Sequence, residues 1–144
     1  MRLINRVIGR ACEVMNLPLK KVEVSVHIVS KEKMRLLNGR HRGKNKSTDV
    51  LSFPLLTKRE ISTLKKKHAI LPIGDIFINR SDAKQENKLA FLVTHGFLHL
   101  LGYDHERSLH QEKIMFAFQD RIMQNVDPMP TSRQVKIEND NVKL

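Results

Sequence analysis

The chain has little sulfur and few aromatic rings: one cysteine, one tyrosine and no tryptophan among 144 residues. The single cysteine, Cys12, excludes an internal disulfide and fits a reducing compartment. Its apolar neighbours predict a packed, unreactive thiol. No apolar run approaches the ~20 residues of a membrane-spanning helix, and no segment resembles a secretory signal. We therefore expect a cytoplasmic protein with no membrane partner.

Acidic residues are also scarce, since 15 Asp and Glu stand against 26 Lys and Arg and leave a formal net charge of +11. The basic residues cluster within residues 40–46 and again in the run 65–67. Such a field attracts polyanions, with an ordinary solvated face as the alternative. Because aromatic rings are few, base stacking is poorly supported and phosphate contacts would carry most of the binding. The charge predicts a nucleic acid partner.

The spacing of apolar residues predicts helices and strands intermixed in one domain, which we place at residues 1–126. The expected elements are helices at 2–16, between Ser30 and Gly39, at 82–101 and at 109–125, and strands at 22–28, 48–53 and 71–78. The last strand is expected to be interrupted at Gly74-Asp75, and residues 55–70 to be a loop with some helix. The pattern predicts an α+β fold, an α/β sandwich with one mixed sheet of about four strands covered by helices.

The apolar pattern ends at residue 127. Residues 127–144 are polar, of mixed charge, and open with Pro128 and Pro130. They offer little to a hydrophobic core, so we expect a mobile tail or one that orders only on a partner.

Three histidines within eleven residues predict a metal site. His95 and His99 lie four residues apart in an apolar segment, which places both on one face of a helix. Gly102 can end that helix in a left-handed conformation and return His105 toward the other two. Three neutral imidazoles leave a fourth zinc position for water, as in catalytic sites. A structural zinc with Asp104 or Glu106 as fourth ligand is the alternative.

The residue after the first histidine bears on the reaction. Metzincin peptidases share this spacing as H-E-x-x-H-x-x-G-x-x-H, with the glutamate as general base. Here that position is Gly96. Loss of a general base costs on the order of 10²–10⁴-fold in rate. Gly96 therefore disfavours a zinc peptidase, and the positive charge favours a polyanionic substrate.

The segment from His95 to His105, H-G-x-L-H-L-x-G-Y-D-H, closely resembles the YbeY family of metal-dependent ribosomal RNA maturation endoribonucleases. Further resemblance lies in Leu37-Asn38, in Arg42-Gly43-Lys44 followed by T-D-V-L-S-F-P at 48–54, and in Gly74-Asp75-Ile76. It extends over roughly residues 20–125. Three features depart from the family pattern: His41 stands where a tyrosine is expected, the segment between Asp75 and His95 is short, and the tail is an addition.

The resemblance implies a single-strand-specific, metal-dependent endoribonuclease in ribosomal RNA maturation, including processing of the 16S rRNA 3′ end, and in ribosome quality control. It implies His95, His99 and His105 as ligands of one Zn²⁺ ion, and Arg42 and His99 as catalytic residues, without a small-molecule cofactor. RNA, the ribosome and ribosomal proteins are the implied partners. Three roles are open for Asp104: it could act as the general base, orient a histidine, or stabilise the turn. The alternative functions are a non-catalytic zinc-containing ribosome assembly factor and a zinc peptidase.

Overall fold

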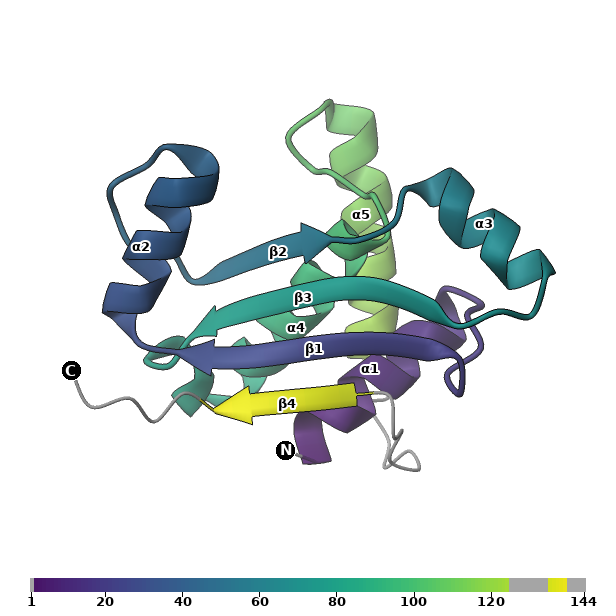
Figure 1. The fold of residues 1–144 in the computed structure, drawn as a ribbon, viewed down its shortest axis with the longest axis horizontal. Coiled ribbons are helices and arrows are strands. Elements are labelled where there is room, and N and C mark those ends of the chain that lie inside the picture. The colour runs from purple at the N-terminus through teal and green to yellow at the C-terminus, as the bar shows by residue number, and fades with distance from the viewer. Residues whose placement is uncertain (1, 125–134, 140–144) are drawn as a thin grey trace.

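The computed structural model describes residues 2–124 and 135–139. Its centre is a mixed four-stranded sheet in the order β2-β3-β1-β4 (Figure 1). The strands are β1 (Val22–Val29), β2 (Val50–Pro54), β3 (Leu71–Asn79) and β4 (Val135–Asn139). Strands β3 and β4 pair parallel with β1, and β2 pairs antiparallel with β3. The α+β prediction is confirmed.

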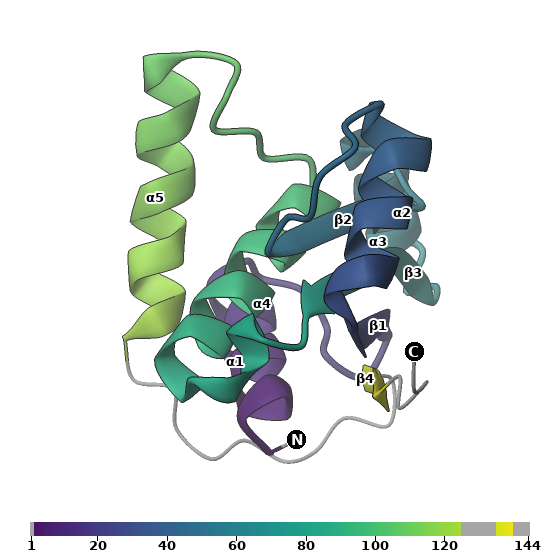
Figure 2. The ribbon, with the colours of Figure 1, turned by 90° about the vertical axis from the view of Figure 1, so that its left-hand side faces the viewer.

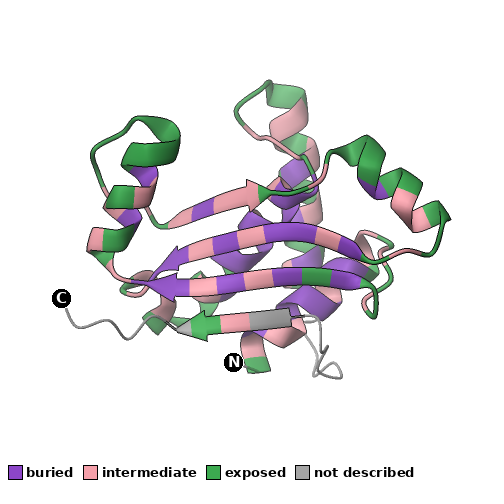
Figure 3. Cartoon of the chain, in the orientation of Figure 1, coloured by how far each residue is buried: buried purple, intermediate pink, exposed green. Residues whose placement is uncertain are grey.

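Helices cover the two faces of the sheet unequally (Figure 2). On one face lie α1 (Arg2–Val14), α4 (Glu86–Leu100) and α5 (Leu109–Met123). On the other, α2 (Lys31–Arg42) packs through Met34 against Leu51 and Val29. Helix α3 (Lys58–Lys66) follows the end of β2 (Figure 1). The sheet therefore keeps one partly open face. Along β1 and β3, residues of intermediate burial that point to this face alternate with buried residues that point to the helices (Figure 3).

Helix α4 is the central helix, because it contacts β2, β3, α1 and α5. Its apolar residues include Phe97, Leu98 and Leu100, all with no exposed surface. Gly96 lies where α4 meets the sheet: a Cβ there would come within 2.7 Å of Ile76 Cγ2 and 3.1 Å of Ser52 Oγ. The Ser52 hydroxyl donates a hydrogen bond to the Gly96 carbonyl at 3.1 Å. The missing side chain thus lets the helix approach β2 closely.

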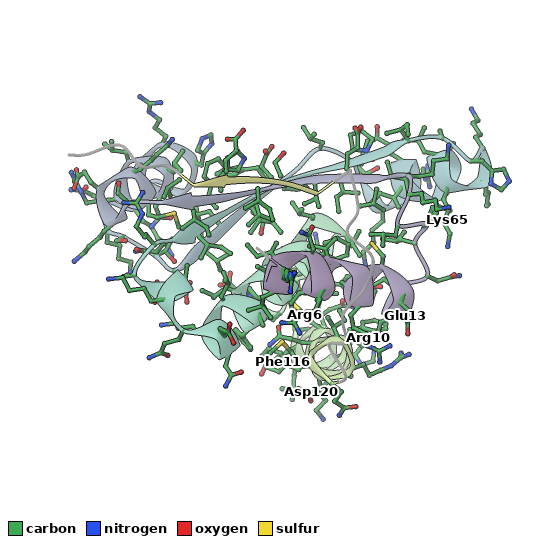
Figure 4. All side chains as sticks on the ribbon, turned by 90° about the horizontal axis from the view of Figure 1, so that it is seen from below. Arg6, Arg10, Glu13, Lys65, Phe116 and Asp120 are labelled. Carbon is green, nitrogen blue, oxygen red and sulfur yellow. The ribbon has the colours of Figure 1, made fainter. Side chains whose placement is uncertain are left out.

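Helix α1 carries the cysteine and a link to α5. Cys12 is buried, and burial raises the pKa of its thiol to about 12, as expected for an unreactive side chain. Arg10 pairs with Glu13 beside α5 (Figure 4). The Arg10 guanidinium also donates to the carbonyls of Arg121 and Gln124 at 3.3 Å each. These contacts satisfy carbonyls that the end of α5 leaves free. None of the helices in the described part of the chain is long and apolar enough to cross a membrane.

Several element boundaries differ from the sequence prediction. The helix that begins after Ser30 continues past Gly39 to Arg42. It ends there because Gly43 takes a left-handed conformation, and the Gly43 N–H caps the carbonyls of Asn38 and Gly39. Residues 55–70 contain α3, whose start has a capping box between Thr57 and Glu60.

Strand β3 is not interrupted at Gly74-Asp75. The ladder with β1 absorbs one extra residue as a register shift next to Glu23 and Val24. The predicted helix over 82–101 is shorter, with a single 3-10 turn at Asp82–Lys84 before α4. Strand β4 lies within the segment for which a tail is predicted, and the rest of that segment falls outside the described residues.

Candidate functional site

The three motif histidines converge. Ligand atoms of His95, His99 and His105 all lie within 4.8 Å of one another. The Nε2 atoms of His95 and His99 are 3.1 Å apart, close to the ~3.3 Å between two nitrogens that share a tetrahedral metal. The ring centroids of His105 lie 5.1 Å from His95 and 5.4 Å from His99. The cluster could hold one metal ion.

Local structure explains this convergence. His95 and His99 project from successive turns of α4, on the face not covered by the sheet core. The helix ends at Leu100, and Gly102 takes φ +95°, where an L side chain is strained. A Cβ at Gly102 would also meet the Lys58 stem at 2.8 Å. The chain can therefore reverse at Gly102 and bring His105 back to the helix.

The site favours the neutral form of two of its imidazoles, those of His95 and His99. Burial lowers the pKa of His99 to about 4, and the neighbouring His95 and His105 add to the shift. Burial also lowers the pKa of His95, against an opposing effect of its hydrogen bond to Gln119. A neutral imidazole has a lone pair for a metal, so these shifts favour metal binding over protonation.

Gln119 on α5 is a site residue that the sequence did not reveal. Its side chain is 4% exposed, and its Oε1 lies 3.2 Å from His95 Nδ1. As an amide oxygen it accepts a hydrogen bond, so His95 carries its proton on Nδ1 and presents the Nε2 lone pair to His99. The available signal was a polar residue on the buried stripe of α5 between Met115 and Ile122.

The histidines open into a cleft of about 730 Å³. Its other walls come from the end of α2, from β2 and from the loop after α4; they are formed by His41, Arg42, Thr48–Pro54, Gly102–Asp104, Glu106 and Arg107. Arg42 is exposed in the last turn of α2. It lines the same cleft as the three histidines. Asp49 lines the cleft as well. Asp75 does not: it accepts a hydrogen bond from His27 Nε2 at 2.9 Å on the open face of the sheet.

Asp104 forms a turn within the histidine loop. Its Oδ1 accepts the Glu106 backbone N–H at 2.9 Å, and its Oδ2 lies 3.8 Å from Arg107 Nε. Asp104 also lines the cleft. The turn that positions His105 is therefore held by this carboxylate.

Gly96 lies against the sheet, next to Ile76 of β3 and Ser52 of β2. Its missing side chain would meet Ile76 and Ser52 at the sheet, so a glutamate would not fit without displacing α4. The peptidase interpretation is disfavoured by packing as well as by residue type.

Comparison with known proteins agrees with this site. The chain matches the model of a family described as Endoribonuclease YbeY over residues 1–127. A protein of that name from Geobacillus sp. (strain WCH70) is 38% identical over 135 residues, which is 86% of this chain and 85% of the relative. Another, from Caldanaerobacter subterraneus subsp. tengcongensis, is 41% identical over 119 residues, 74% of this chain and 75% of the relative.

A solved structure has the same architecture. The solution structure of TM1509 from Thermotoga maritima superposes with a TM-score of 0.53 at 29% identity, covering 86% of this chain and 81% of that one. Family match, curated relatives and fold all agree with the three-histidine cleft. The chain belongs to the Endoribonuclease YbeY family.

Proposed function

We propose that this chain is a metal-dependent endoribonuclease that cleaves single-stranded RNA in ribosomal RNA maturation, including the 16S rRNA 3′ end, and in ribosome quality control. The observation that carries the proposal is one cleft shared by Arg42 and the three histidines. Family membership supplies the endoribonuclease activity, and the net charge of +11 suits an RNA substrate and a ribosomal setting with ribosomal proteins as neighbours.

The residues present fit a zinc ion. His95, His99 and His105 supply three imidazoles, the ligand set of catalytic zinc sites that keep one position open. The buried Nδ1 of His105 has no hydrogen-bond partner among residues 2–124 and 135–139, a cost that a bound ion would remove. When bound, zinc would polarise a phosphate oxygen or lower the pKa of water. We assign a catalytic role to His99 through its part in holding the metal next to the substrate.

Arg42 is the residue that we assign to the phosphate. Its guanidinium is planar and permanently charged, so it can hold two phosphate oxygens at once and offset charge that develops during cleavage. The last turn of α2 fixes its backbone, and Gly43 ends the helix behind it. Lysine would keep the charge but lose the paired hydrogen bonds.

Asp104 is our candidate for proton transfer. Asp104→Asn keeps an oxygen that can accept the Glu106 N–H and removes only the basic carboxylate. If Asp104 accepts a proton in the reaction, this variant loses kcat and keeps its metal. If it acts only in the turn, cleavage persists.

The decisive experiment incubates the zinc-loaded full chain with single-stranded RNA, duplex RNA, structured ribosomal RNA and casein. We expect cleavage of unpaired RNA, with at least 100-fold loss in His99→Ala and Arg42→Ala. Arg59→Ala removes an exposed arginine of α3 and is the control. Circular dichroism verifies that each variant is folded.

Equal cleavage by the His99→Ala protein would overturn the mechanism. RNA binding without cleavage by the wild type would favour the non-catalytic assembly factor. Cleavage of casein would support the alternative function, a zinc peptidase. Metal analysis of the purified chain tests the choice of zinc, because imidazole also suits nickel and copper.

A further inference from the structure

His41 and Phe53 form an aromatic corner in the wall of the cleft. Their ring centroids lie 4.6 Å apart with planes at 64°, an edge-to-face contact. His41 is exposed at the end of α2, whereas Phe53, near the end of β2, is only partly so. Both line the cleft that contains the three histidines. We propose that this corner is a stacking subsite for one unpaired nucleobase next to the phosphate held by Arg42; the proposal rests on the proposed function.

The corner is held rigidly from behind. Phe53 packs edge-to-face on Phe77 at 5.4 Å, and Phe77 stacks on His27 at 4.3 Å with an interplanar angle of 10°. His27 in turn contacts Asp75 and Glu138, each at 2.9 Å. A row of rings therefore runs from the cleft across the open face of the sheet. Because these rings are already ordered, a base that stacks on the first of them costs little conformational entropy.

The neighbouring charges select a nucleotide over another planar ligand. His41 directly precedes Arg42, and the same end of α2 carries exposed Arg40 and, just beyond it, Lys44. Phosphate and base alternate along an RNA strand, so an arginine and an aromatic ring at adjacent positions match one nucleotide step. A base within a duplex has both faces covered, and only an unpaired base can use this corner. The corner would thus contribute to single-strand specificity.

Other aromatic rings near the site are less suited to this role. Tyr103 lines the cleft, but Lys58 Nζ lies 4.3 Å above its ring and Phe118 packs against it edge-to-face at 5.3 Å. One face of the Tyr103 ring is therefore covered by Lys58, and the ring already has an aromatic partner. Phe91 and Phe116 are exposed but do not line the cleft.

A substrate with one missing base tests the proposal. A single-stranded RNA oligonucleotide that the wild type cleaves is prepared with an abasic nucleotide at each position around the cleavage point. Binding is measured on the full chain in EDTA, and cleavage on the zinc-loaded chain. We expect one abasic position to weaken wild-type binding roughly 5- to 100-fold. His41→Ala should weaken binding of the intact RNA by a similar factor and become insensitive to that abasic site.

Variants separate stacking from charge and from packing. His41→Phe keeps a ring without a titratable group and should retain the abasic sensitivity, whereas His41→Gln should lose it. Phe53→Leu keeps apolar volume in the packed cluster and should weaken binding less than His41→Ala. His110→Ala, an exposed histidine of α5 outside the cleft lining, is the matched control. In addition, 2-aminopurine at the sensitive position should lose fluorescence on binding to the wild type, His41→Phe and His110→Ala, but not to His41→Ala.

The outcomes divide cleanly. If the wild type cleaves single-stranded RNA and His41→Ala shows unchanged affinity and unchanged abasic sensitivity, the stacking subsite is wrong and the proposed function stands. If no abasic position affects the wild type, the subsite is likewise wrong. If the wild type neither binds nor cleaves RNA, both proposals fall.

Discussion

The side chain of Gln119 lies 3.2 Å from His95 Nδ1, through an oxygen that is buried between α4 and α5. This contact joins the third turn of α5 to the first histidine of the cleft. It fixes the ring so that His95 Nε2 faces His99 Nε2. A residue that orients a metal ligand through a hydrogen bond contributes to metal affinity, and its substitution lowers that affinity.

Gln119→Leu should therefore weaken zinc binding about 10- to 100-fold. Leucine has a similar volume but cannot accept a hydrogen bond from His95 Nδ1, so the His95 ring is free to rotate and to take the other tautomer. Competition with a chromophoric chelator measures the affinity. Gln111→Leu makes the same chemical change at the start of α5 and should leave the affinity unaltered. Unchanged binding in Gln119→Leu would mean that packing alone orients His95.

The metal-free protein should lose stability as the pH falls. The pKa of His99 is about 4 in the folded chain, against about 6.5 in an unfolded one. Above pH 6.5 the ring is neutral in both states and contributes nothing; between 6.5 and 4 the unfolded state binds more protons, so unfolding becomes easier. His95 shifts in the same direction.

Thermal melts of the metal-free chain at pH 7 and pH 5 measure this effect. We expect a smaller loss of Tm in His99→Gln than in the wild type, because glutamine does not titrate. His110→Gln, in the exposed first turn of α5, should behave like the wild type. An identical loss of Tm in all three proteins would contradict the assignment to His99.

Two glycine substitutions should have opposite effects. In Gly96→Ala the new methyl group would lie 2.7 Å from Ile76 Cγ2. The overpacking costs about 1–3 kcal/mol, which exceeds the gain of up to about 1 kcal/mol from helix propensity. Gly39→Ala, in the exposed part of α2, meets nothing closer than Lys44 O at 3.8 Å and should stabilise by about 0.5–1 kcal/mol. Urea unfolding checks both. A neutral Gly96→Ala would show that α4 can shift away from the sheet.

We propose residues 1–126 as the functional domain, with the tail as an addition. A chain truncated after residue 126 should fold and retain the cleft, because β4 occupies the sheet edge farthest from β2. Some stability should be lost, since Ile137 packs against the core and Glu138 pairs with His27. A truncated chain that is unfolded by circular dichroism, or that no longer binds zinc, would show that the tail is integral.

The sequence predicted the parts of the molecule that depend on local spacing. The i, i+4 relation of His95 and His99 follows from helix geometry alone. The turn at Gly102 follows from the conformational freedom of glycine. The alternation of residues 22–28 predicted β1, because a half-buried strand must alternate.

Boundaries were less predictable, because they depend on contacts outside the segment. Arg42 was expected to lie beyond a helix that ends near Gly39, but α2 continues until Gly43 caps it. Gly74-Asp75 reads as a break, but the ladder with β1 carries the strand through it. In residues 135–139, Val135 and Ile137 alternate with polar residues, but so short an alternation within a polar segment did not predict a strand, and its pairing depends on the edge of β1.

The sequence by itself determined the three imidazoles, the glycine that returns the third, and a charge suited to RNA. Only the tertiary structure decided what stands beside them. Gln119, twenty-four residues from His95, reaches it because α5 packs on α4. Likewise, a composition poor in aromatic residues predicts little stacking, yet the fold brings His41 and Phe53 together at one wall. Periodicity and motif spacing are properties of neighbouring residues, whereas a cleft is made by residues that only packing makes neighbours.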